Sequence, residues 1–472
     1  MSAPEKQQPC LHLENNTEAP KAITETALPF SPADEKRLVR KLDRTILPWI
    51  MLLYLLSYID RSNMGNARNI GLEEDIGLSS VQYQIASASF YIGHRHIRYD
   101  RRSDAEGREA FYAACVNPGG LIAVRFFLGV FEASFAPGCA LYLSFWYLKS
   151  ELSLRIAAYA GMSALSGVIS GVVAYSMGLA KNMAVTSWQG LFLVEGLPTI
   201  AVGAATFWML PGRPESGKSF WFTDEEHQII LNRRSRFTRN ADEGISKAQV
   251  KAAFLDYRLY LFCVMYSGLS LSLAVAAVFL PTIVKDLGYH SVQANLMTAP
   301  IYAVAYVTLL VTATLSDRFR TRGIPISIGG LIAGTGYICL GLLKDDLARY
   351  VTCFLAVTGT YMAFPIVLTW ITSTFAGDTK AGVGLGIVIA VTHAVGVAAS
   401  NIYPKTDAPY YLMGNAVSSS LVFLTALSAV IMSVMLYREN RHRDRRFGRP
   451  EADVPIDMGG DADKAQDYRY EI

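Results

Sequence analysis

Long apolar stretches alternate with short charged segments along most of this 472-residue chain. A run of about 18 or more apolar residues is long enough to cross the hydrocarbon core of a membrane as a helix. Several such runs in series predict an all-α membrane protein, a bundle of helices that crosses the lipid bilayer repeatedly. The pattern predicts ten spans, at about 46–67, 120–147, 155–179, 188–210, 258–283, 294–316, 324–343, 350–375, 380–403 and 411–437.

Basic residues collect before the first span, between the fourth and fifth spans, and after the last span. Because basic loops stay in the cytosol, we expect both termini and the central loop on the cytosolic side. A large loop between two helical halves is the layout of a duplicated transporter. The predicted regions are a disordered tail (1–44), an N-terminal half (45–210), a central loop (211–257), a six-helix C-terminal half (258–437) and a basic tail (438–472).

The N-terminal half is interrupted after Gly93 by a run of charged residues, at 94–113. The apolar piece before it, at 81–93, would reach only about 20 Å as a helix, which is too short to span. Charges at the bilayer centre cost about 2.5–3.5 kcal/mol each, so the insert does not complete the crossing. Either two crossings are missing, or the region dips into the membrane and returns. A single crossing would invert every later basic loop.

Charged residues within the apolar runs are the main candidates for chemistry. The apolar part before Asp60 and Arg61 has only 14 residues, so a full crossing carries this pair in or near the membrane. Arg125, Gly129 and Glu132 have i, i+4, i+7 spacing and therefore share one helix face. Such charges usually mark a substrate or proton path. Alternatively, Asp60 and Arg61 lie at the membrane interface, and the charges of Arg125 and Glu132 form a structural ion pair with a neighbouring helix.

Tyr266 and His393 are polar candidates in the C-terminal half. A histidine titrates near neutral pH, although a lone membrane histidine is more often a hydrogen-bonded packing residue. Catalytic motifs such as HExxH and GxSxG and phosphate-binding loops are absent from suitable contexts, and the six cysteines form no CxxC pair. We therefore expect no enzyme, no cofactor, no metal and no nucleic-acid partner, and transport driven by an ion gradient rather than ATP.

Specific strings add a family resemblance to this picture. They are YIDRSNMGNAR at 58–68, RFFLGVFEA at 125–133, APGCALYLSFWY at 136–147 and YPKTDAPYY at 403–411. Together they resemble the major facilitator superfamily, and more narrowly the fungal allantoate permease-like group of its anion:cation symporter family. The resemblance implies two six-helix halves that rock around a central site, in a monomer located in the plasma membrane.

The resemblance also implies residue roles. In similar proteins one arginine on helix 1 and another on helix 4 bind the substrate carboxylate, while nearby acids carry protons. By position, this assigns Arg61 and Arg125 to anion binding, and Asp60 and Glu132 to proton coupling. We add Tyr266 and His393 to the substrate site as further candidates.

The turn at 316–323 resembles the second-half copy of the family's cytosolic gating motif, with Asp317, Arg318 and Arg320 in its charged positions. Family members carry a full second and third span, which are truncated or missing here. The leading hypothesis is a proton-coupled symporter for a small organic anion, such as a vitamin, a ureide or an amino-acid derivative. The alternatives are a non-transporting relic or sensor on the same fold, and an exporter of a small metabolite.

Overall fold

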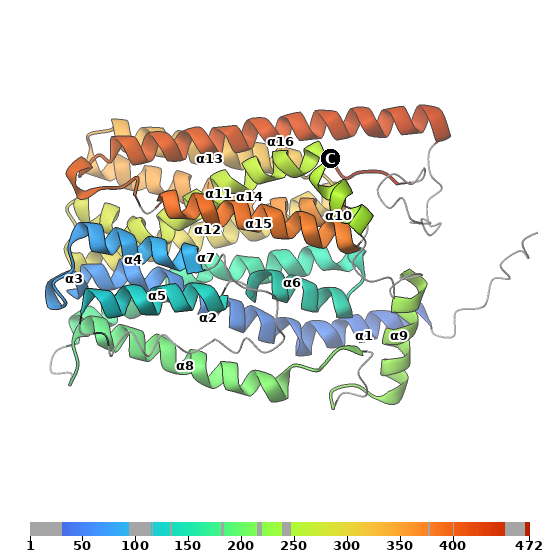
Figure 1. The fold of residues 1–472 in the computed structure, drawn as a ribbon, viewed down its shortest axis with the longest axis horizontal. Coiled ribbons are helices and arrows are strands. Elements are labelled where there is room, and N and C mark those ends of the chain that lie inside the picture. Colours follow the sequence, from blue (N-terminus) through green and yellow to red (C-terminus); the bar gives the residue numbers. More distant parts are fainter. Residues whose placement is uncertain are drawn as a thin grey trace, which may run out of the picture.

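Every regular element in the described part of the chain is helical, and most helices run side by side in one elongated bundle (Figure 1). The computed structural model describes residues 31–93, 115, 117–132, 135–180, 184–214, 220–237, 247–375, 378–399, 401–448 and 468–472. The elements are α1 (Pro32–Thr45), α2 (Leu47–Asn69), α3 (Leu72–Asp75), α4 (Ser80–Gly93), α5 (Pro118–Glu132), α6 (Phe135–Trp146), α7 (Lys149–Leu179), α8 (Ser187–Met209), α9 (Asp224–Phe237), α10 (Lys247–Phe254), α11 (Tyr257–Asp286), α12 (Ser291–Phe319), α13 (Gly323–Leu342), α14 (Asp346–Thr374), α15 (Asp378–Ala399), the 3-10 turn η3 (Lys405–Asp407) and α16 (Leu412–Phe447).

Nine helices in the described ranges are long and apolar enough to cross a membrane. They coincide with nine of the predicted spans, so the predicted all-α, multi-pass architecture is confirmed. The predicted span 120–147 corresponds to α5 and α6, which lie on either side of residues 133 and 134, outside the described ranges.

The two halves of the bundle meet mainly where α7 packs against α12, α2 against α11, and α4 against α15. Glycines allow the α7–α12 contact to be close. A Cβ on Gly167 would lie 2.5 Å from the Tyr302 ring, and one on Gly171 would lie 2.7 Å from the Asn295 carbonyl. The small-residue spacing in α7 therefore serves packing between the halves.

The predicted disordered tail is wrong from Pro32 onward, where α1 begins. The Ser31 hydroxyl caps this helix by accepting a hydrogen bond from the Ala33 N–H at 3.2 Å. Leu38 and Leu42, one helical turn apart, are fully buried against the bundle. A short stripe of apolar residues in a polar sequence is enough to hold a helix when the bundle covers it.

The central loop carries a short helix, α9, which lies across one end of the bundle (Figure 1). A capping box starts this helix, because the Thr223 N–H donates to Glu226 Oε2 at 2.9 Å and the Glu226 N–H donates to Thr223 Oγ1 at 3.3 Å. Lys41 Nζ of α1 lies 2.6 Å from Glu226 Oε2. We refer to this end as the α9 end and to the opposite one as the α3 end.

The predicted charged insert at 94–113 lies outside the described residues. The helix before it, α4, has 14 residues and is therefore about 21 Å long. It packs against α5, where a Cβ on Gly129 would collide with the Phe90 carbonyl. The absence of a side chain at Gly129 therefore lets α4 approach this face of α5 closely.

Candidate functional site

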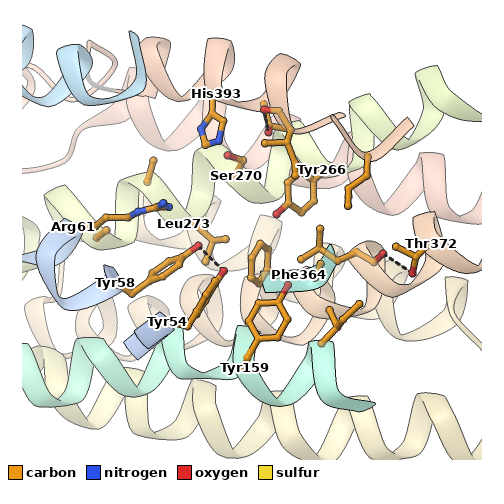
Figure 2. A pocket seen from close by; sticks show the side chains of 18 residues that line it. Tyr54, Tyr58, Arg61, Tyr159, Tyr266, Ser270, Leu273, Phe364, Thr372 and His393 are labelled. Atoms are coloured by element: carbon orange, nitrogen blue, oxygen red, sulfur yellow. Dashed lines mark hydrogen bonds between the residues drawn. The ribbon is translucent and has the colours of Figure 1, made fainter. Parts of the chain in front are cut away.

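A cavity of about 880 Å³, its open mouth included, lies between the two halves of the bundle. Both halves contribute to the wall, so a change in their relative position would change access to the cavity. The side chains used below are Tyr54, Tyr58 and Arg61 of α2, Tyr159 of α7, Tyr266 of α11, Phe364 of α14 and His393 of α15 (Figure 2).

Arg61 connects this cavity to an ion pair with Glu132. Its Nε lies 3.1 Å from Glu132 Oε2, and its guanidinium lies 4.6 Å from the centroid of the Tyr58 ring. The Ser57 hydroxyl donates to the other carboxylate oxygen of Glu132. Glu132 is only 7% exposed. Protonation of this buried carboxylate would remove the counter-charge of Arg61.

Asp60 and Arg125 are both 3% exposed, and neither belongs to the cavity wall. Asp60 adjoins Arg61 in sequence and therefore projects from a different side of α2. Arg125 lies on α5 about 10 Å along the helix axis from Glu132, toward the α3 end. The structure thus joins Arg61 with Glu132, while the roles of Asp60 and Arg125 stay predictions.

Tyr266 and His393 both line the cavity together with Arg61. The Tyr266 ring stacks on Phe364, with ring centroids 5.7 Å apart. His393 lies on the other side of the cavity from Tyr54 and Tyr159 (Figure 2). The three candidates, which came from sequence positions up to about 330 residues apart, therefore share one site.

The sequence interpretation missed the tyrosines on the N-terminal wall. Tyr54 lies 4.9 Å from Tyr58 and 4.8 Å from Tyr159, measured between ring centroids. The signal was present, because Tyr54, Tyr58 and Arg61 have the same i, i+4, i+7 spacing that marks the Arg125 face.

A polar network holds the two halves together between the cavity and the α3 end. Asn69 Nδ2 of α2 donates to Asn295 Oδ1 of α12 at 2.9 Å and to the Pro281 carbonyl of α11 at 3.1 Å. Asn295 Nδ2 donates in turn to the Asn66 carbonyl at 3.3 Å. Asn66 Nδ2 donates to Ser170 Oγ of α7 at 2.7 Å. The three bonds that involve Asn69 and Asn295 cross from one half to the other, whereas the Asn66–Ser170 bond lies within the N-terminal half. The crossing bonds must break before the halves can separate at this end.

At the α9 end, Asp317 of the predicted gating turn pairs with Arg322. The Arg322 side chain is buried, whereas Arg318 and Arg320 are exposed. Arg320 ends α12 in the left-handed conformation, with φ 51°. The sequence interpretation missed Arg322, although it follows the same alternating pattern of arginines in this turn. The gating roles of Asp317, Arg318 and Arg320 stay predictions.

Residues 468–472 dock on the same end of the C-terminal half. Glu471 Oε2 lies 3.0 Å from Arg322 Nε. The guanidinium groups of Arg258 and Arg443 each lie 4.8 Å from the centroid of the Tyr470 ring. Tyr470 is 5% exposed. This segment therefore links the gating turn to α11 and α16.

Among the described residues, no group of three or more His, Cys, Asp and Glu side chains is arranged to hold a metal ion. The titratable side chains that line the cavity are those of Tyr54, Tyr58, Arg61, Tyr159, Tyr266 and His393.

Comparison with solved structures places this arrangement in a known fold. A bacterial homolog of the human lysosomal transporter Spinster, in an inward-facing and unoccupied conformation, matches with a TM-score of 0.59 at 14% identity, over 85% of this chain and 96% of that chain. The Escherichia coli xylose transporter XylE, in a partially occluded inward-open conformation, matches with a TM-score of 0.58 at 13% identity, over 84% and 97% of the two chains. At these identities the similarity shows the fold alone.

Sequence comparison shows the family. An uncharacterized transporter of Schizosaccharomyces pombe is 30% identical over 97% of this chain and 93% of its own length. The major facilitator-type transporter hxnP of Emericella nidulans is 30% identical over 92% and 93% of the two chains. Residues 110–400 match the family model described as Major Facilitator Superfamily. The chain therefore belongs to the major facilitator superfamily, and it is a multi-pass membrane transporter rather than an enzyme.

Proposed function

We propose that the protein is a proton-coupled symporter of a small organic anion, with Arg61 as the cation that binds the carboxylate and Glu132 as the proton carrier. The ion pair between the buried Glu132 and the half-buried Arg61, beside the cavity, is the observation that carries the proposal. When Glu132 is ionised, it neutralises Arg61. When Glu132 is protonated, the guanidinium becomes available to a substrate carboxylate, which it can bind through two parallel hydrogen bonds.

This exchange keeps the buried charge of the site constant. The empty carrier pairs Arg61 with ionised Glu132, and the loaded carrier pairs Arg61 with the substrate anion. A buried charge that loses its partner costs several kcal/mol, so states with unpaired charge are disfavoured. The carrier would therefore rearrange only when it is empty and deprotonated, or loaded and protonated, which is the condition for coupled transport.

The geometry also suggests how access alternates. The asparagine network at the α3 end joins the halves, and the basic residues around α9 and α10 favour the cytosol for the opposite end. This conformation would then be closed toward the outside of the cell, with both termini cytosolic and the plasma membrane as the proposed location. Arg125 and Asp60, buried nearby, are proposed as the second anion-binding and proton-coupling groups.

Purified protein in liposomes tests the proposal. We expect the wild-type chain to accumulate a labelled monocarboxylate when the outside is acidic and the lumen alkaline. Glu132→Gln should lose this accumulation while it keeps exchange of labelled for unlabelled anion, because a neutral side chain leaves Arg61 permanently available. Arg61→Ala should lose both activities. Accumulation by Glu132→Gln would contradict the proton-coupling role, and a wild-type chain without any uptake would favour the non-transporting alternative.

A further inference from the structure

The cavity has aromatic walls on both sides, one from each half of the bundle. Tyr54, Tyr58 and Tyr159 form the N-terminal wall, with Tyr54 packed edge-on against Tyr159 at an interplanar angle of 70°. Tyr266 and Phe364 form the C-terminal wall as a nearly parallel pair, with an interplanar angle of 21°. The rings of both walls surround the centre of the cavity (Figure 2).

The positive charge lies at the edge of one aromatic wall. The Arg61 guanidinium stacks on the Tyr58 ring at 4.6 Å from its centroid and also lies 5.2 Å from the Phe90 ring. This stacking fixes the direction in which the planar guanidinium can receive a carboxylate. A carboxylate bound there carries the rest of its molecule toward the space between the two walls (Figure 2).

We infer that the substrate is an aromatic carboxylate, held with its carboxylate at Arg61 and its flat ring between the two aromatic walls. This inference rests on the proposed function and narrows its substrate class. Aromatic rings attract one another in offset-stacked and edge-to-face arrangements at centroid distances of about 4.5–7 Å. A flat ring can form such contacts with both walls at once, and its conjugated carboxylate lies in the plane of the ring.

An aliphatic acid is the main competitor, because Leu273, Leu385 and Ile389 also line the cavity. These side chains offer apolar contact to any substrate of suitable size. They do not explain why both faces of the cavity carry rings, since aliphatic residues would bury an alkyl chain equally well. The two substrate classes are therefore distinguished by comparing an aromatic acid with an aliphatic acid of the same size and charge.

Benzoate and cyclohexanecarboxylate provide that comparison, because they share a six-membered carbon ring and one carboxylate. We would measure binding of both to the purified full chain by isothermal titration calorimetry. Benzoate is expected to bind at least about fivefold more tightly, which corresponds to one good aromatic contact. Equal affinity, or a preference for the saturated acid, would overturn the aromatic class and leave the symport proposal intact. If neither acid binds, the aromatic class fails, and the liposome assay decides the symport proposal separately.

Two substitutions at Tyr266 test whether the C-terminal aromatic wall causes the preference for benzoate. Tyr266→Leu removes the ring, and we expect it to bring the ratio of the two affinities close to one. Tyr266→Phe keeps the ring and is expected to keep the ratio. A ratio that survives Tyr266→Leu in a correctly folded protein, as judged by size-exclusion chromatography, would contradict the role of the C-terminal wall. The wild-type ratio remains decisive if the leucine variant does not fold.

Discussion

Glu132 at the end of α5 and Arg61 in α2 are 71 positions apart in the chain and form an ion pair beside the central cavity, in which Glu132 is buried and Arg61 half-buried. The pair places the proposed proton carrier directly against the proposed anion-binding group. On α2, Arg61 also shares a face with Tyr54 and Tyr58, so the charge and the aromatic wall belong to one surface. The consequences of this arrangement can be tested residue by residue.

The geometry of Arg61 predicts that a lysine cannot replace it fully. Arg61→Lys keeps the positive charge, but it loses the planar group that stacks on Tyr58 and offers two parallel donors. We expect the affinity for the transported anion to fall on the order of tenfold, with the protein still folded. Calorimetric titration measures this directly, and Arg445→Lys, at an exposed position of α16, is the matched control. An unchanged affinity in Arg61→Lys would contradict the bidentate role.

The asparagine network predicts that Asn69 controls access from the α3 end. Asn69→Ala removes two hydrogen bonds between the halves, each worth about 1 kcal/mol. We expect this end to open more often. The measurement is labelling of a single cysteine placed at Ala277 in the cavity wall by a membrane-impermeant maleimide, in a background without native cysteines.

The labelling rate of the Asn69→Ala chain should rise on the order of tenfold when the reagent is applied from the α3 side. Ser420→Ala, at an exposed position of α16, serves as the control and should not change the rate. The same rate in Asn69→Ala and in its parent would show that the network does not hold this end closed.

Asp256, just before α11, predicts a pH dependence of stability. Its carboxylate oxygens lie 2.8 Å from Arg258 Nε and 2.8 Å from Lys380 Nζ. Burial opposes ionisation, but the hydrogen bonds and charges of Arg258 and Lys380 hold the pKa of Asp256 below its ordinary value. A lowered pKa gives a stabilisation that is full above the unfolded value, near pH 4, and is lost as the pH falls through the folded value.

We therefore expect Asp256→Asn to destabilise the protein by roughly 3 kcal/mol at pH 7, because Arg258 and Lys380 lose their shared partner. The difference from wild type should shrink as the pH falls below about 4. Thermal unfolding in detergent measures both effects. Asp346→Asn, on an exposed side chain, should have little effect at either pH. A loss of stability that is independent of pH would contradict the ion-pair explanation.

The docking of residues 468–472 predicts that the aromatic ring of Tyr470 contributes more to stability than its hydroxyl does. Tyr470→Ala removes the ring that contacts Arg258 and Arg443, and each such contact is worth about 0.5–1 kcal/mol or more. Tyr470→Phe keeps both contacts and loses the hydrogen bond from Arg443 Nη2 to the hydroxyl, at 3.2 Å. We expect the alanine variant to lower the melting temperature by several degrees and the phenylalanine variant by less than half as much. Equal losses would assign the stabilisation to the hydroxyl.

The membrane spans were predictable because hydropathy is a property of local sequence. The helix α1 was not, because its polar sequence hides a short apolar stripe that only the packed bundle reveals, at Leu38 and Leu42.

The site was partly predictable for a related reason. A charged residue in an apolar run is conspicuous, so Arg61 and Glu132 were found individually. Their pairing depends on how α2 and α5 pack, which no single segment specifies. Tyr54 and Tyr159 escaped notice because a tyrosine in a membrane span is common and becomes informative only when several gather around one cavity.

Substrate-driven proton movement tests the Arg61–Glu132 mechanism most directly. Liposomes that contain the protein and a pH-sensitive dye would receive an inward gradient of the transported anion, with protein-free liposomes as the control for passive entry of the neutral acid. We expect the wild-type chain to acidify the lumen as the anion enters, and Glu132→Gln to exchange anion without acidification. Acidification by Glu132→Gln at the wild-type rate, or wild-type anion entry without any acidification, would contradict proton coupling through Glu132.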